Sequence, residues 1–165
     1  MIVKELPNDQ FMPHIRELIS NGHTVSLRLK GNSMRPFLES LRDKALLAPC
    51  TQPKKGDAIL AQIKDGRYVL HRIVKIEGNN ITLMGDGNVG FTEHCQRADV
   101  LGIATHFYRK GRMKPDATNG WKWKFYSFIW THLSGLRRYL LAFYRRIWLN
   151  LFPIKINNTQ TEYEN

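Results

Sequence analysis

The first part of the chain has short segments in which apolar and polar residues alternate or apolar residues form brief runs, with Gly, Pro, Asn and Asp between them. This pattern is typical of strands joined by tight turns. It predicts strands at residues 24–30, 44–48, 57–63, 67–76, 80–84 and 99–108. The fold class that follows is mainly β, with the strands forming a compact and mostly antiparallel domain.

Two other segments have apolar residues at steps of three and four, which is the spacing of an amphipathic helix. The first is residues 9–21, and Gly22 ends it. The second is residues 121–152, where an apolar stripe runs through Ile129, Leu133, Leu136, Leu140, Phe143, Ile147 and Leu151. We therefore expect a short N-terminal helix before the β domain and an amphipathic helical appendage after it.

These patterns divide the chain into four parts. Residues 1–22 form an N-terminal segment with the short helix, and residues 23–112 form the β domain. Residues 113–152 form a basic, aromatic and amphipathic helical segment. Residues 153–165 are expected to be a disordered tail, because they contain too few apolar side chains to be held against a core.

The positive charge is concentrated at one end of the chain. The formal net charge is +11, yet residues 1–108 carry 14 Lys and Arg against 11 Asp and Glu. Residues 109–155 carry 11 Lys and Arg against one acid, Asp116. This imbalance suggests that the C-terminal segment seeks an anionic surface.

Three interpretations of residues 121–152 remain open. The segment is an interfacial helix on anionic lipid, a nucleic-acid-binding arm, or a helix that packs its apolar stripe on the β domain. The lipid interpretation ranks first and packing second, because the segment is too apolar for a solvated nucleic-acid arm, so nucleic acid is an unlikely partner. The expected membrane contacts are Trp121, Trp123, Trp130, Arg137, Arg138, Arg145, Arg146 and Trp148.

Other functional classes have little support in the sequence. No signal peptide or run of about 18 apolar residues is visible. Cys50 and Cys95 form no CxxC pair, and His94 next to Cys95 is a poor metal signal, so we expect no metal and no cofactor. The expected location is intracellular, in the cytoplasm and peripherally associated with a membrane.

Three residues form a candidate catalytic group. Ser33 lies in a tight turn, GNSMRPFL at 31–38, and a serine needs a neighbouring base to become a nucleophile. His71 lies inside the longest predicted strand, where the imidazole would be partly desolvated and held in one rotamer, as a general base requires. Asp86 lies in a Gly-flanked turn and could orient the imidazole. Each residue alone also fits an ordinary structural role: a polar turn residue, a buried histidine bonded to backbone, and a turn aspartate.

The serine turn also offers candidates for substrate binding. The backbone N–H of Ser33 is a natural donor to an oxyanion, and Gly31 permits the close turn that exposes it. Met34 is a candidate wall of the substrate groove and also a candidate core residue. Pro36 fixes the path by which the chain leaves the turn.

Four ordered motifs resemble those of the type I signal peptidases, whose superfamily also contains the self-cleaving SOS-type repressors. They are GNSMRP at 31–36, KKGDAILA at 54–61, YVLHRIVKI at 68–76 and MGDGN at 84–88. The resemblance implies Ser33 as nucleophile, His71 as general base and Asp86 as the orienting acid. The bacterial enzymes have lysine at the position of His71. The histidine found here resembles that of the endoplasmic-reticulum and archaeal branch.

The chain also departs from these families. Signal peptidases have a membrane-spanning helix just before the serine, whereas this chain has the short helix at 9–21. The endoplasmic-reticulum branch has a further aspartate after its last motif, and here FTEH at 91–94 offers Glu93 as a weak substitute. No DNA-binding domain like that of the SOS-type repressors is visible in the 22 residues before the β domain.

The function expected from residues and resemblance together is that of a serine endopeptidase. It would cleave a signal or leader peptide from an extended precursor protein through an acyl-enzyme. The alternative is a non-catalytic peptide-binding or regulatory domain of the same fold, docked on a membrane surface. A third and weaker reading is a membrane or nucleic-acid adaptor acting through residues 121–152.

Overall fold

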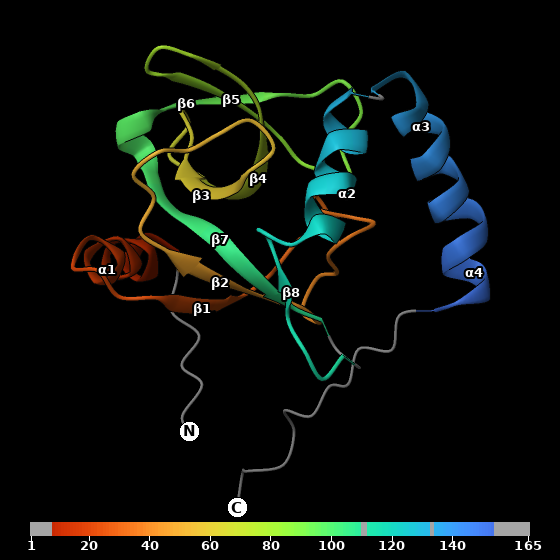
Figure 1. Cartoon of the computed structure of the whole chain (residues 1–165), viewed down its shortest axis with the longest axis horizontal. Helices are drawn as coiled ribbons and strands as arrows, with labels where there is room; N and C mark the ends of the chain where they lie inside the picture. Colours follow the sequence, from red (N-terminus) through yellow and green to blue (C-terminus); the bar gives the residue numbers. More distant parts are fainter. Residues whose placement is uncertain (1–7, 110–111, 133, 154–165) are drawn as a thin grey trace, which may run out of the picture.

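The computed structural model describes residues 8–109, 112–132 and 134–153, so Leu133 of the apolar stripe and nearly all of the expected tail lie outside the described residues. Its centre is one curled antiparallel sheet (Figure 1). The strands are β1 (Val25–Arg28), β2 (Lys44–Ala48), β3 (Ala58–Gln62), β4 (Tyr68–Glu77), β5 (Asn80–Met84), β6 (Glu93–Gln96), β7 (Val100–Tyr108) and β8 (Asp116–Ala117). Their order is β1-β2-β7-β3-β4-β5-β6, and β8 pairs with β7. The mainly β fold class is confirmed.

The six predicted strands all form, with ends that differ from the prediction by at most three residues. Two further strands carry too little pattern to be predicted. Strand β6 has four residues and pairs with β5 at the edge of the sheet. Strand β8 has two residues and pairs with His106 and Phe107 of β7. Both are short enough that the neighbouring strand, rather than their own sequence, decides their conformation.

The short helix predicted at residues 9–21 forms as α1 (Asn8–Ser20), and it packs on the sheet. Ile15 and Ile19 are buried in a core that also contains Leu47 and Phe107. The helix approaches strand β7 closely at Gly102, since a Cβ there would lie 2.9 Å from Ile19 Cδ1. This small residue in β7 therefore lets α1 cover one part of the sheet.

The C-terminal segment is not one continuous helix. Helix α2 (Trp121–His132) lies against the sheet, and α3 (Ser134–Phe143) follows beside it (Figure 1). A π-helical turn, η2 (Tyr144–Trp148), and the short α4 (Leu149–Leu151) complete the segment. Trp123 of α2 is buried against the rings of Phe37 and Phe107, with centroid distances of 4.8 and 4.9 Å. The β domain and α2 therefore share one core.

Three of the expected membrane contacts are wrong. Trp123, Trp130 and Arg137 are buried, with 4 to 6% of their surface exposed, so none of them can reach a lipid surface. The reason is tertiary, because α2 and the start of α3 pack on the β domain. Trp121, Trp148, Arg138, Arg145 and Arg146 are exposed. Within the described part of the chain, no helix has the length and hydrophobicity needed to cross a bilayer.

Candidate active site

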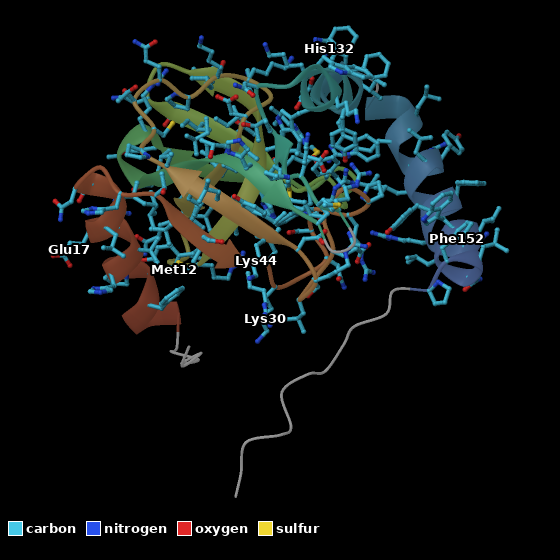
Figure 2. The ribbon with its side chains drawn as sticks, turned by 60° about the horizontal axis from the view of Figure 1, so that its bottom comes forward. Met12, Glu17, Lys30, Lys44, His132 and Phe152 are labelled. Carbon is cyan, nitrogen blue, oxygen red and sulfur yellow. The ribbon has the colours of Figure 1, made fainter. Side chains whose placement is uncertain are left out.

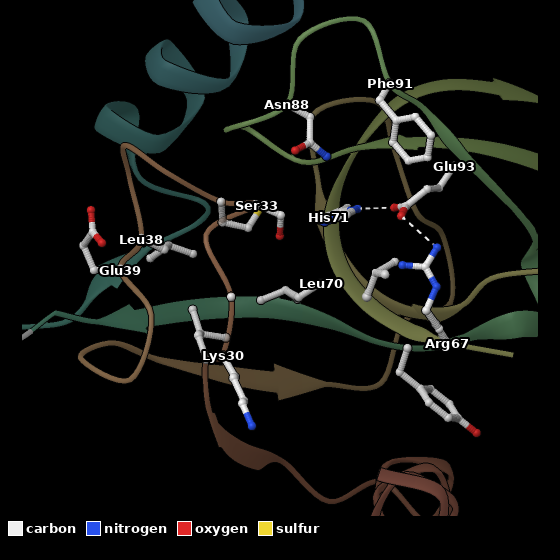
Figure 3. Close-up of a pocket in the computed structure, with 15 residues that line it drawn as sticks. Lys30, Ser33, Leu38, Glu39, Arg67, Leu70, His71, Asn88, Phe91 and Glu93 are labelled. Atoms are coloured by element: carbon white, nitrogen blue, oxygen red, sulfur yellow. Dashed lines mark ion pairs between the residues drawn. The ribbon is translucent and has the colours of Figure 1, made fainter. Parts of the chain in front are cut away.

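Ser33 and His71 line the same cavity, which has a volume of about 410 Å³ (Figure 3). Its walls come from the serine turn, from strand β4 and from the segment that leads into β6. Figure 3 shows Ser33 and His71 at the cavity, with Asn88, Phe91 and Glu93 around the histidine. The structure thus brings together two of the three residues predicted to be catalytic.

The serine turn is held by close contact with the Gly-Asp-Gly turn at 85–87. The N–H of Gly87 donates a hydrogen bond of 2.6 Å to the carbonyl oxygen of Ser33. A Cβ at Gly85 would lie 2.6 Å from that same oxygen, and one at Gly87 would lie 2.7 Å from the carbonyl oxygen of Asn32. Both glycines are therefore required because two backbones meet there. This contact fixes the position of the nucleophile candidate relative to strand β4.

The structure also shows the conformation and surroundings of Gly31, Met34 and Pro36, the other residues predicted to matter in the serine turn. Gly31 has a φ of 102°, a conformation that favours glycine. Met34 is buried in the core, as one interpretation expected, and it also lines the cavity, so its role as a wall of a substrate groove stays a prediction. The peptide bond before Pro36 is cis. Among the described residues, the backbone N–H of Ser33 has no hydrogen-bond acceptor, which leaves it available to a developing oxyanion.

His71 is buried on strand β4, and its Nδ1 lies in direct contact with the Glu93 carboxylate of strand β6. Glu93 is itself only 8% exposed, and its other oxygen lies 3.8 Å from Arg67 Nη2. Burial lowers the pKa of His71 below 6.5, and the negative charge of Glu93 opposes that shift. The imidazole is therefore neutral near pH 7, with one nitrogen bound to a carboxylate. This is the state that a general base needs.

Asp86 does not contact the imidazole, so the predicted pairing with His71 differs from the observed one. Its carboxylate instead accepts two hydrogen bonds from the Arg72 guanidinium, at 2.8 and 2.7 Å. The reason lies in the alternation of a strand: consecutive residues of β4 point to opposite faces, and Asp86 lies on the face of Arg72. The carboxylate on the face of His71 is Glu93.

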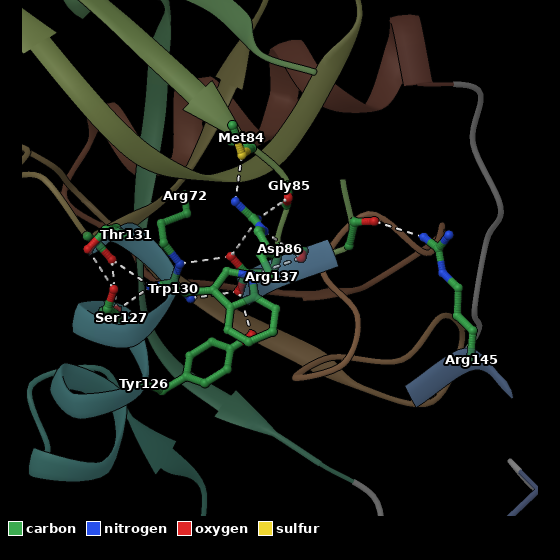
Figure 4. A network of polar contacts seen from close by, with 12 residues as sticks. Arg72, Met84, Gly85, Asp86, Tyr126, Ser127, Trp130, Thr131, Arg137 and Arg145 are labelled. Carbon is green, nitrogen blue, oxygen red and sulfur yellow. Dashed lines mark hydrogen bonds and ion pairs between the residues drawn. The ribbon is translucent and has the colours of Figure 1, made fainter. Parts of the chain in front are cut away.

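Asp86 is the centre of a polar network that joins the C-terminal helices to the β domain (Figure 4). Its carboxylate is fully buried and also accepts a hydrogen bond of 3.1 Å from the Tyr126 hydroxyl. The Trp130 indole N–H donates to the Asp86 carbonyl oxygen at 2.8 Å. The Arg72 guanidinium lies over the Trp123 ring, 4.3 Å from its centroid. Asp86 thus has a structural role in binding helix α2.

Helix α3 and η2 hold the remaining carbonyl groups of the same turn. Arg137 donates to the carbonyl oxygen of Gly85 at 2.6 Å, and Arg145 donates to that of Gly87 at 2.9 Å (Figure 4). Each carbonyl of the 85–87 turn therefore receives a hydrogen bond from the C-terminal segment. Since this turn also contacts Ser33, the segment supports the serine turn from behind.

Asn88 is a further candidate that sequence reasoning missed. A Cβ at Gly85 would lie 3.0 Å from both the Asn88 side-chain nitrogen and Ser33 Cβ, so these two side chains are near neighbours. Asn88 also lines the cavity. A side-chain amide beside the serine can supply a second hydrogen bond to an oxyanion. Its position directly after the Gly-Asp-Gly turn is the only signal that the sequence offered.

Three further observations bear on the chemistry available in the described residues. Among the described residues, the Ser33 hydroxyl makes no hydrogen bond to His71 or to any other group, and catalytic hydrogen bonds are often long or unformed in free enzymes. No group of three or more potential metal ligands lies together in the described residues. Cys95 lies in the core, where burial raises its pKa to about 11 and keeps the thiol protonated.

Comparison with known proteins agrees with this fold. A family model described as peptidase S24-like matches residues 2–104, which include the serine turn, the histidine strand and Glu93. No curated protein gives a significant match. The family lies in the superfamily that contains the SOS-type repressors and the signal peptidases, so the resemblance of the four sequence motifs is confirmed at that level. Because the match covers more than half of its length, this chain belongs to the peptidase S24-like family of serine peptidase-type domains.

Proposed function

We propose that the protein is a serine endopeptidase in which Ser33 attacks the peptide carbonyl, His71 accepts the serine proton, and Glu93 orients the imidazole. The observation that carries the proposal is the buried His71–Glu93 pair at the cavity that also contains Ser33. A histidine with one nitrogen on a carboxylate has the other free for the serine hydroxyl. The family membership supports the same reaction class.

The proposed reaction has two stages. The Ser33 oxygen forms a bond to the carbonyl carbon of the substrate, and His71 passes the serine proton to the departing amine as the peptide C–N bond breaks. Water then attacks the acyl carbon and gives a proton to His71. The ester bond to the Ser33 oxygen breaks, His71 returns the proton to that oxygen, and the acid is released. The Ser33 N–H and the Asn88 amide stabilise the oxyanion in both stages.

The proposed substrate is an extended peptide, such as the signal or leader peptide of a precursor protein. Part of the cavity wall is apolar, with Leu29, Leu38 and Leu70 beside Met34. Such a wall favours small or apolar side chains on the substrate. The histidine base supports the endoplasmic-reticulum and archaeal branch of signal peptidases as the nearest type, and this assignment rests on the sequence resemblance.

A fluorescent alkyl phosphonate tests the proposal directly, because it reacts with an activated serine whatever the natural substrate is. We expect stoichiometric labelling, and peptide mass spectrometry should place the adduct on Ser33. Ser33→Ala should abolish labelling, and His71→Ala should slow it by a factor of roughly 10² to 10⁴. Ser20→Ala is the matched control, because the Ser20 hydroxyl is exposed, donates to the Glu17 carbonyl oxygen on helix α1 and does not line the cavity.

The second candidate is a peptide-binding domain without turnover. The missing hydrogen bond from the Ser33 hydroxyl favours it. No labelling of the wild-type protein, together with no cleavage of a peptide library, would establish this second candidate. Labelling that persists in the Ser33→Ala protein would contradict the assignment of the nucleophile.

A further inference from the structure

The outer side of the last helices is apolar. We use the name outer stripe for seven apolar side chains of α3, η2 and α4 and of the residue directly after α4, all 44 to 67% exposed: Leu136, Leu140, Phe143, Ile147, Trp148, Leu151 and Phe152. These residues include most of the stripe that the sequence predicted. Figures 1 and 2 show these helices at the edge of the molecule, away from the sheet. The described residues therefore leave this stripe uncovered.

The inner side of the same helices is polar where an amphipathic helix would be expected to be apolar. Arg137 is 4% exposed and points at the 85–87 turn, where it binds backbone carbonyl oxygens. Tyr144 donates a short hydrogen bond to Glu39, and Arg145 binds the carbonyl of Gly87. Leu141 is the buried apolar residue of this side. These bonds fix the rotation of the helix so that its apolar side faces outward.

An uncovered row of seven large apolar side chains is unusual for a protein that acts alone, and such a patch marks an interaction surface. The charges around it indicate which kind of surface. Residues 117–153 contain no Asp or Glu. Arg138 and Arg146 are exposed beside the stripe, and Lys122 and Lys124 are exposed on α2. A partner must therefore be apolar at its centre and negative at its edge.

We propose that the outer stripe docks on the surface of an anionic lipid bilayer, with the helices lying in the interface. Phe143, Trp148 and Phe152 would enter the region between headgroups and acyl chains, and the arginines would meet lipid phosphates. A second copy of the chain fits less well, because two segments with this positive charge repel each other. Nucleic acid fits less well because leucine and isoleucine side chains gain nothing from stacked bases.

Co-sedimentation of the purified full chain with vesicles tests this proposal. Vesicles of phosphatidylcholine and phosphatidylglycerol should bind the protein, and vesicles of phosphatidylcholine alone should bind it much more weakly. Added salt should weaken the binding, because it screens the arginines. This inference does not depend on the peptidase activity, so phosphonate labelling of Ser33 can succeed or fail without deciding it.

Two pairs of substitutions separate the apolar and electrostatic parts. Phe143→Ser with Ile147→Ser should weaken vesicle binding at least tenfold. Arg138→Gln with Arg146→Gln should weaken it by roughly 25-fold on anionic vesicles, since each arginine near the surface contributes about a fivefold effect. Met113→Ser is the matched apolar control, because Met113 is fully exposed and lies outside these helices. Lys44→Gln with Lys64→Gln is the charge control.

All these positions are exposed, so the variants should unfold at the wild-type temperature, and circular dichroism should verify it. Three results would overturn the proposal. The first is binding that the Phe143 and Ile147 pair does not reduce. The second is tight binding of a single-stranded oligonucleotide without binding to vesicles. The third is a dimer in sedimentation velocity that dissociates when the outer stripe is substituted, again without vesicle binding.

Discussion

The imidazole of His71 and the carboxylate of Glu93 lie in direct contact, both buried, at the cavity that contains Ser33. The two residues are 22 positions apart in the sequence and lie on strands β4 and β6, with β5 between them. This contact takes up Nδ1 and leaves Nε2 as the nitrogen available to a hydroxyl. This arrangement gives the proposed base both a fixed orientation and a fixed tautomer.

Glu93→Gln tests the orienting role. The glutamine keeps the size of the side chain but removes the charge that stabilises an imidazolium, so we expect phosphonate labelling of Ser33 to slow by a factor of roughly 10² to 10⁴. Because Glu93 raises the pKa of His71, the midpoint of the pH profile should also move to lower pH. Glu77→Gln is the control, since Glu77 is an exposed residue that pairs with Lys75. An unchanged rate and midpoint would reject Glu93 as a positioning residue.

The pH dependence of labelling follows from the burial of His71. The base acts only when neutral, and burial lowers its pKa below 6.5, so labelling should stay on its plateau at pH 7 and fall as the pH drops through a midpoint below 6.5. Rates measured from pH 4 to pH 9 give the midpoint. A midpoint above 7 would mean that another group limits the reaction.

The lowered pKa of His71 also makes the stability of the protein depend on pH, and linkage gives the direction of that dependence. The unfolded chain binds a proton at His71 at higher pH than the folded chain does, so the free energy of unfolding should fall as the pH is lowered from about 6.5 towards the folded pKa. Urea denaturation of wild type and His71→Gln at several pH values measures this. The difference between the two proteins should be constant above pH 7 and change only below 6.5.

Asp86→Asn should damage the fold more than the chemistry. The substitution leaves the guanidinium of Arg72 buried without its carboxylate, and loss of one partner of a buried ion pair costs about 3–5 kcal/mol of the free energy of unfolding. Chemical denaturation gives this loss. Under conditions where the variant is folded, labelling of Ser33 should remain within about tenfold of wild type, an allowance smaller than the effect expected for a triad member. A stable but unreactive variant would restore Asp86 as a candidate catalytic residue.

Gly85→Ala tests the contact between the serine turn and the Gly-Asp-Gly turn. The new methyl group would lie 2.6 Å from the Ser33 carbonyl oxygen, so one of the two backbones must move. We expect a loss of at least tenfold in the labelling rate together with lower thermal stability, since an active-site displacement of about 1 Å can cost 10²-fold. Gly135→Ala is the control: its Cβ would meet nothing within 4 Å, and alanine favours the helix. It should unfold at the same or a higher temperature.

The positions of Ser33 and His71 were predictable because both depend on local sequence. The serine lies in a turn with its own glycine and proline, and the histidine lies in a long alternating strand. The acid was not predictable in the same way. Asp86 had the stronger local signal, because it lies in a Gly-flanked turn. The two glycines, however, are needed because two backbones approach closely at Gly85 and Gly87. Glu93 lies on a four-residue edge strand that had no pattern of its own.

The sequence by itself determined the six main strands, the N-terminal helix and the identity of the serine and histidine candidates. These features follow from alternation, helical spacing and turn residues, which act over a few positions. Only the tertiary structure decided which carboxylate meets His71, because consecutive residues of β4 face opposite sides and each side has its own acid. It also decided which side of α3 faces outward. Hydrogen bonds from Arg137 of α3 and Arg145 of η2 to the 85–87 turn fix this orientation, and no local sequence pattern predicts a bond to a distant backbone carbonyl.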